Sequence, residues 1–186
     1  MTISVIVISA ELMVRFLRPQ ASLYPRWQYS AKYGKVLYKN TKMVHYMPGK
    51  WKFIYSINSY GYRGPLIPIS NKYIKNNIVI LGDSYAFGTG VNDGEEFSAI
   101  MQNRLRDKYD VINLSCGGYG LTQEIRRYYE FGQLYFPKFV ILQFCSNDLD
   151  DNLMNCVTNV ENARFVFTNT TNIASHINKY LSYSLI

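Results

Sequence analysis

Three polar segments of the chain each follow an apolar run, and together they offer the residue types of an acyl-transfer site. The first segment contains Ser84, the second Gly118 and the third Asn147. A serine hydroxyl can attack an ester carbonyl, and the attack leaves a negative oxygen that needs preorganised donors. The backbone N–H groups of Ser84 and Gly118 and the side-chain amide of Asn147 are the candidate donors. The segments therefore predict Ser84 as a nucleophile with three oxyanion-hole donors.

Three further polar residues in these segments are candidates for a supporting role. Asp83 precedes Ser84, Asn113 ends the second apolar run and Asp148 follows Asn147. Each segment alone is a weak signal, because Gly-Asp-Ser, Gly-Gly and Asn-Asp are also common turn and cap sequences. The first segment is neither the Gly-x-Ser-x-Gly elbow nor a P-loop. The hypothesis rests on the order of the segments and on their shared place after successive strands.

The elements around these segments alternate between strand and helix. Apolar runs predict strands, helical spacing of apolar residues predicts helices, and the order implies right-handed βαβ units. We therefore expect an α/β fold with three α/β/α layers and a flavodoxin-like parallel sheet, whose carboxyl edge gathers the three segments. The expected strands are Ile78–Leu81, Val111–Leu114 and Phe139–Phe144; the expected helices are Glu95–Lys108, capped by Asn92 or Asp93, and Thr122–Tyr135, capped by Thr122.

The pattern weakens after residue 152, where we expect only a strand at Arg164–Thr168 and a helix at Ile173–Tyr183. Three convincing strands are few for a sheet of this kind. We therefore expect the α/β domain, residues 76–186, to be partial and incomplete at its C-terminus.

Charge divides the chain of 186 residues unevenly. Residues 1–75 hold twelve Lys or Arg and one acidic residue, whereas residues 76–186 hold eight Lys or Arg and twelve acidic residues. A basic segment can contact a membrane surface, a nucleic acid or an acidic glycan, or simply be solvated. No nucleic-acid-binding motif accompanies it, so we expect no nucleic acid partner.

Two segments precede the α/β domain. Residues 1–18 are mostly apolar but shorter than the roughly 20 residues that span a bilayer, so they fit a remnant of a membrane anchor or a short amphipathic helix. They are compatible with a membrane-anchored or extracytoplasmic location in a bacterium. Residues 19–75 are expected to form an irregular lead-in with short strands near Lys35–Tyr38 and Trp51–Tyr55.

The three segments resemble the conserved blocks of the SGNH (GDSL) hydrolase superfamily. Residues 78–88 (Ile-Val-Ile-Leu-Gly-Asp-Ser-Tyr-Ala-Phe-Gly) are similar to the block with the nucleophile, residues 111–120 to the block with the oxyanion glycine, and residues 140–148 to the block with the oxyanion asparagine. Residues 58–65 (Asn-Ser-Tyr-Gly-Tyr-Arg-Gly-Pro) resemble the sequence that precedes the serine block in many bacterial members. The resemblance implies a serine hydrolase that acts on small esters or acylated glycans.

The chain departs from this family at two places. Ser146 stands where the family often has glycine. The family's Asp-x-x-His, whose histidine activates the serine, is not found, because His176 has no Asp three residues before it and His45 precedes the whole sheet. No catalytic His or Asp is therefore identified, and we expect weak or no activity from this chain.

Two other functions stay open at this stage. An acyltransferase would use the same site and pass the acyl group to a glycan hydroxyl, and a non-catalytic module would bind a small molecule or sugar. We expect no cofactor and no metal, because the acidic residues near Asp148 are equally explained by a helix N-terminus. Three cysteines, Cys116, Cys145 and Cys156, form no disulfide or zinc pattern.

Overall fold

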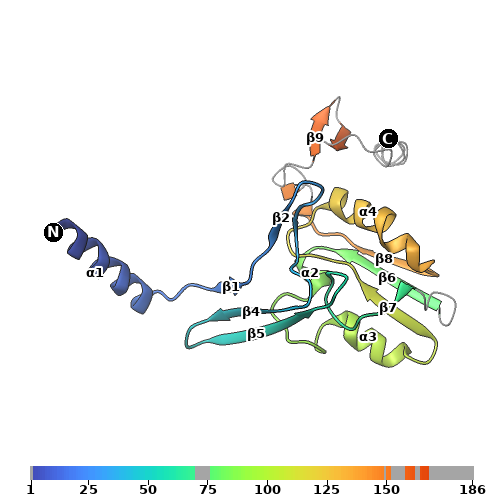
Figure 1. The fold of residues 1–186 in the computed structure, drawn as a ribbon, viewed down its shortest axis with the longest axis horizontal. Helices are drawn as coiled ribbons and strands as arrows, with labels where there is room; N and C mark the ends of the chain where they lie inside the picture. Colours follow the sequence, from blue (N-terminus) through green and yellow to red (C-terminus); the bar gives the residue numbers. More distant parts are fainter. Residues whose placement is uncertain (1, 70–75, 149, 152–157, 162–163, 168–186) are drawn as a thin grey trace.

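A computed structural model describes residues 2–69, 76–148, 150–151, 158–161 and 164–167. At its centre is a parallel sheet of three strands, β6 (Asn76–Gly82), β7 (Tyr109–Asn113) and β8 (Phe139–Gln143), in the order β7-β6-β8. This is the order of the first three strands of a flavodoxin-like sheet, so the expected α/β fold and parallel sheet are confirmed. Figure 1 shows the sheet between helices α3 and α4.

Alternate residues of the central strand β6 pack against the two helical layers. Ile78 and Ile80 lie in a core cluster with Met101 and Leu105 of α3 (Phe97–Leu105). Val79 and Leu81 point to the other face, where α4 (Leu121–Glu130) and the 3₁₀ helix η2 (Gly132–Tyr135) contribute a second cluster. Both faces of β6 are buried, which explains its continuous apolar sequence.

Both helices begin later or end earlier than their sequence patterns predict. Glu96, not Asn92 or Asp93, is the N-cap of α3, and it makes no capping hydrogen bond with its side chain. Asn92 and Asp93 instead accept hydrogen bonds from the backbone N–H groups of Ile54 and Ser56 on β5. The prediction was wrong because these side chains serve a neighbouring strand.

The start of α4 is also different from the expected one. Gly120, not Thr122, is its N-cap, and the Gln123 side chain accepts a hydrogen bond of 2.8 Å from the Gly120 N–H. Thr122 lies inside the helix and is buried. The helix ends at Glu130, and η2 covers the rest of the expected span.

Residues 19–75 contain more regular structure than their sequence suggests. Five strands form two antiparallel sheets, β1-β4-β5 and β2-β3. Their bounds are β1 (Ser22–Tyr24), β2 (Gln28–Ser30), β3 (Gly34–Val36), β4 (Thr41–Met47) and β5 (Trp51–Ile57). The structure describes residues 19–69 of this lead-in. Figure 1 shows its long hairpin β4-β5, one end of which lies near α2.

The two ends of the chain add three elements. Helix α1 (Thr2–Leu17) extends from the body of the molecule (Figure 1), and among the helices described none has the length and apolarity to cross a membrane. Strands β9 (Thr158–Glu161) and β10 (Arg164–Phe167) pair antiparallel, which agrees with the expected strand at 164. The expected helix at 173–183 lies outside the described residues.

Arg63 joins the lead-in to the loop that follows Ser84. Its side chain is fully buried and donates to the carbonyls of Phe87 (3.0 Å), Gly88 (2.7 Å) and Val91 (2.9 Å). Its guanidinium also pairs with carboxylates, at 3.3 Å from Asp93 and 3.5 Å from Glu96. A planar fork with five donors is suited to this many acceptors, and lysine cannot replace it.

We expect Arg63→Met to lower the free energy of unfolding by about 3–5 kcal/mol, because it leaves the buried Glu96 carboxylate and three loop carbonyls without their donor. Urea unfolding followed by circular dichroism measures the loss. Arg104→Met is the matched control, since Arg104 is exposed on α3 and should change stability by only about 0.5 kcal/mol. Equal losses in the two variants would contradict the assigned role of Arg63.

Candidate active site

Ser84 opens a short helix at the carboxyl end of the central strand. Helix α2 spans Ser84–Phe87, and the Asp83 side chain caps it by accepting from the Tyr85 N–H at 2.9 Å. Gly82 before it has φ +153°, and a Cβ there would lie 2.6 Å from Ala86 Cβ, so no side chain fits. Gly88 ends the helix in the left-handed conformation. The turn therefore fixes Ser84 tightly at the edge of the sheet.

The glycine loop after β7 runs directly beside this turn. The N–H groups of Leu114 and Cys116 donate to the carbonyls of Ile80 (2.9 Å) and Gly82 (3.2 Å), which extends the pairing of β6 and β7 beyond the strands. A Cβ on Gly117 would lie 3.8 Å from Ser84 Cβ, so this loop approaches the serine closely. The structure thus brings together Ser84, Gly117 and Gly118.

Asn113 supports this arrangement from below. Its side-chain amide donates to the Ala86 carbonyl and to Ser98 Oγ, both at 2.9 Å, so it connects β7 to α2 and α3. It is buried and lies behind the turn that carries Ser84.

The side chain of Asn147 is hydrogen-bonded to two carboxylates. Its Nδ2 donates to Asp83 Oδ2 at 3.2 Å and to Asp151 Oδ2 at 2.8 Å. Asp148 is fully buried and accepts from the Cys145 N–H at 2.7 Å. In this arrangement both amide hydrogens of Asn147 face carboxylates, so donation to a reacting oxygen requires its side chain to turn.

A group of carboxyls is buried behind these loops. Burial, reinforced by the nearby charges of Asp148, Asp83 and Asp151, raises the pKa of Glu124 to about 9. Burial also raises the pKa of Asp148, against a hydrogen bond from Cys145 that lowers it. Within the described part of the chain, His, Cys, Asp and Glu side chains form no group of three or more that could hold a metal ion.

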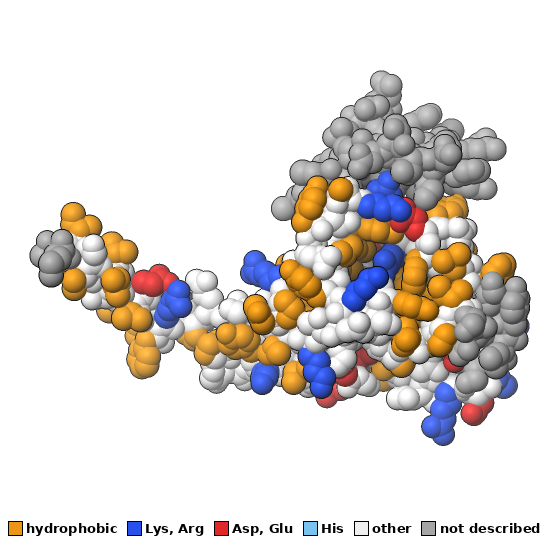
Figure 2. All heavy atoms as spheres, in the orientation of Figure 1, with side chains coloured by type: hydrophobic (Ala, Val, Ile, Leu, Met, Phe, Trp, Pro, Cys, Tyr) orange, Lys and Arg blue, Asp and Glu red, His pale blue; other side chains and the backbone are white. Residues whose placement is uncertain are grey.

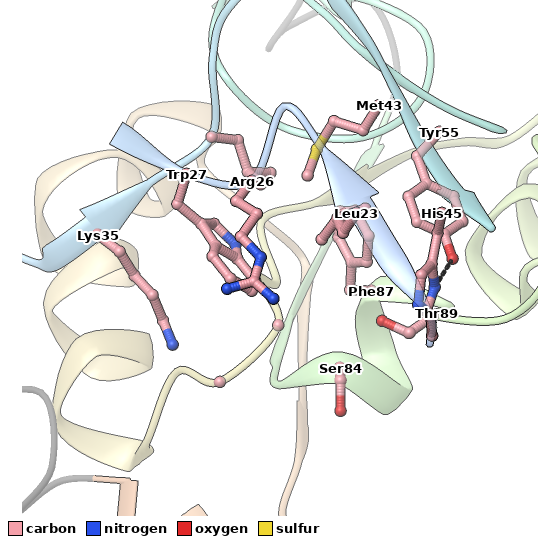
Figure 3. Close-up of a pocket in the computed structure, with 14 residues that line it drawn as sticks. Leu23, Arg26, Trp27, Lys35, Met43, His45, Tyr55, Ser84, Phe87 and Thr89 are labelled. Atoms are coloured by element: carbon pink, nitrogen blue, oxygen red, sulfur yellow. Dashed lines mark hydrogen bonds between the residues drawn. The ribbon is translucent and has the colours of Figure 1, made fainter. Parts of the chain in front are cut away.

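A cavity of about 310 Å³ opens beside Ser84. The segments that follow β6 and β7 supply one part of its wall, and the lead-in supplies most of the rest (Figure 3). The lining consists of Ala21, Leu23, Arg26, Trp27, Lys35, Leu37, Met43, His45, Tyr55, Ser84, Phe87, Thr89, Gly117 and Gly118. No sequence pattern indicates that the lead-in faces the serine, because its cavity residues are spread over short strands and the segments between them and form no chemical motif.

The position of His45 before the whole sheet argues against it as the histidine that activates the serine. It lies in the same cavity as Ser84, but its Nδ1 is 3.0 Å from Tyr55 Oη and its ring packs edge-on against Trp51. Figure 3 shows the Ser84 side chain directed away from the His45 ring, and Ser84 Oγ has no hydrogen-bond partner among the described residues. Burial lowers the pKa of His45, which favours the neutral form of the ring. His176 lies outside the described residues.

Comparison with known proteins agrees with the sequence resemblance. The profile of the GDSL-like lipase/acylhydrolase family matches residues 80–178, more than half of the chain. The chain belongs to this family. A search of the curated proteins found no match.

Two solved structures are similar to part of this chain. TesA is 24% identical over 42% of this chain and 44% of its own, with a TM-score of 0.37. AlinE4, described as an SGNH-hydrolase family esterase, is 22% identical over 44% of this chain and 49% of its own, with a TM-score of 0.34. The chain thus spans less than half the length of either.

The pKa of Glu124 predicts how stability depends on pH. Because the folded-state pKa is raised above the unfolded value of 4.5, the folded state binds the proton more tightly, and stability falls as pH rises from about 4.5 to 9. Glu124→Gln mimics the protonated form and should remove this contribution, which is about 1.4 kcal/mol per pH unit at most. Urea unfolding at pH 5 and pH 8 measures it.

We expect the glutamine variant to be clearly more stable than the unmodified chain at pH 8 and nearly equal at pH 5. Glu95→Gln is the control, because Glu95 is exposed. A stability difference for Glu124→Gln that stays constant between the two pH values would disprove the burial argument.

Proposed function

We propose that the protein is a serine ester hydrolase in which Ser84 is the nucleophile. The observation that carries the proposal is the position of Ser84, which opens α2 at the carboxyl end of β6 and lines a cavity together with Gly117 and Gly118. Carboxyl ends of parallel strands are where ligands bind in open α/β sheets. Small esters and acylated glycans are the substrates we propose.

The chemistry follows from the groups around the serine. Ser84 Oγ attacks the ester carbonyl, and the carbonyl oxygen becomes negative. The N–H groups of Ser84 and Gly118 stabilise this oxygen, and Asn147 adds a third donor once its amide turns from Asp83 and Asp151. The Ser84 proton passes to solvent, and the tetrahedral intermediate collapses to an acyl-serine as the alcohol leaves with a proton from solvent. Water then attacks the acyl-serine, which releases the carboxylic acid and restores Ser84. Where no side chain accepts the Ser84 proton, as among the described residues, only the part of catalysis due to binding and the oxyanion donors remains.

A fluorophosphonate probe tests the nucleophile even where turnover is slow. Serine attack on phosphorus expels fluoride and leaves a covalent adduct that mass spectrometry detects. We expect labelling of the unmodified chain, no labelling of Ser84→Ala, and a parallel loss of 4-nitrophenyl acetate hydrolysis to the background rate. Ser22→Ala, an exposed serine on β1, should label as the unmodified chain does. Labelling of Ser84→Ala at another residue would overturn the assignment.

The same experiment separates hydrolysis from the two alternatives. Acyl transfer would appear as an acylated glycan when an oligosaccharide acceptor is added, and a binding module would show no adduct at Ser84.

We further propose that α1 attaches the protein to a membrane surface. Residues 3–17 of the helix are all exposed, and Figure 2 shows apolar side chains along its visible face. They include Ile6 and Phe16, which are 66% and 87% exposed. The basic residues Arg15 and Arg18 adjoin them, and the segment up to residue 75 is strongly basic. Apolar side chains with adjacent cations favour the interface of an anionic bilayer.

Sedimentation with vesicles tests this attachment. We expect binding to vesicles that contain phosphatidylglycerol and weaker binding to neutral vesicles. Ile6→Asp combined with Leu12→Asp should weaken binding at least roughly tenfold, because each apolar side chain contributes about 1.5–3 kcal/mol when buried. Labelling of Ser84 by the fluorophosphonate should not change. Equal binding of the unmodified and doubly substituted chains would exclude the helix as the attachment site.

A further inference from the structure

The cavity beside Ser84 combines an apolar wall with positive charge. Leu23, Leu37, Met43 and Phe87 supply apolar surface, and these side chains belong to or pack against one core cluster. Among the described residues that line the cavity, Arg26 and Lys35 are the two cations and none is a carboxylate, while burial lowers the pKa of His45 and so favours its neutral ring. A cavity with charges of one sign concentrates ligands of the opposite sign.

Lys35 reaches the part of the cavity where a reacting carbonyl would lie. Its Nζ is 5.2 Å from the centre of the Trp27 ring, a cation–π contact that orients the ammonium group. A Cβ on residue 118 would collide with this Nζ, so the ammonium group occupies the space that the glycine leaves open. Figure 3 shows Lys35, Trp27 and Arg26 on one side of the cavity, opposite His45 and Tyr55.

No carboxylate neutralises this cation within the described residues. Lys32, three residues earlier on the same hairpin, pairs with Glu130 at 2.6 Å, whereas Lys35 has no such partner in the described chain. Lys35 is also partly buried, so its charge is less screened than that of a surface lysine. A half-buried, unpaired ammonium group beside a nucleophile is suited to an anionic ligand.

We infer that the Ser84 site selects esters that carry a second, anionic group, which binds Lys35 with help from Arg26 while the apolar part lies against Leu23, Leu37 and Phe87. This inference rests on the proposed function, because it assigns the substrate class of the same site. The selecting residues belong to the lead-in, outside the segment 80–178 that matches the family profile. The anion preference is therefore assigned to two cations, Arg26 and Lys35, that lie N-terminal to the matched segment.

Two esters of matched length test the inference by turnover. 4-Nitrophenyl hydrogen adipate carries a carboxylate at the end of the acyl chain, and 4-nitrophenyl hexanoate is its neutral counterpart. In the unmodified protein we expect a higher kcat/KM for the adipate ester, and in Lys35→Met this preference should fall about tenfold or more, as loss of a charge-assisted hydrogen bond implies. Lys52→Met is the control, because Lys52 is exposed on β5 outside the cavity.

Binding of the corresponding 4-nitroanilides tests it without turnover. Trp27 lines the cavity, and after Trp51→Phe it is the only tryptophan of the chain, so its fluorescence reports occupancy. We expect the adipic anilide to bind at least several-fold more tightly than the hexanoic anilide, with a difference that shrinks in Lys35→Met and at high salt.

The outcomes of the two tests are distinct. Equal affinity for the two anilides, or equal weakening of both by Lys35→Met, would overturn the inference and leave Lys35 a role in shaping the cavity or stabilising the oxyanion. Selective binding of the adipic anilide without labelling of Ser84 by the fluorophosphonate would uphold anion recognition and refute the serine hydrolase.

Discussion

The buried guanidinium of Arg63 is the interaction on which the geometry of the site depends. It binds three carbonyls at the end of α2 and in the loop that follows, and lies 4.6 Å from the Tyr55 ring, so one side chain links the Ser84 turn to strand β5. The loop after α2 contains Gly88, Gly90 and Gly94, and glycine has the most backbone freedom of any residue. Without the bonds to Arg63, this loop would therefore hold Ser84 poorly. Arg63, within the motif at residues 58–65, thus holds the turn that carries Ser84 in place.

Contacts between the lead-in and the loop after Ser84 also explain why the lead-in can shape the cavity. Tyr55 contacts Arg63 on one side, and its hydroxyl accepts from the Gly90 N–H at 3.0 Å and meets His45 on the other. Asn92 and Asp93 bind the backbone of β5 farther along. The hairpin β4-β5 is therefore fixed to the Ser84 loop along several residues, and its cavity face keeps a defined distance from the serine.

Sequence patterns were sufficient for the sheet and insufficient for the cavity. The central strand β6 contains a continuous apolar run because both of its faces are buried, and such a local signal survives without tertiary information. The caps were misjudged because Asn92 and Asp93 satisfy a distant strand. Lys35 and His45 reach the site only through the packing of the lead-in, and no spacing along the chain encodes that contact.

Ser84 lies between two regions of opposite electrostatic character. Behind it are the buried carboxyls, where the raised pKa of Glu124, about 9, keeps one member neutral near pH 7 and so limits the negative charge of the group. On the cavity side are Lys35 and Arg26. A developing oxyanion is repelled by carboxylates and attracted by cations, so its favourable position is toward Gly118 and Lys35. In the reaction we propose, the polarity of the site and the loop geometry thus favour the same direction for the ester carbonyl.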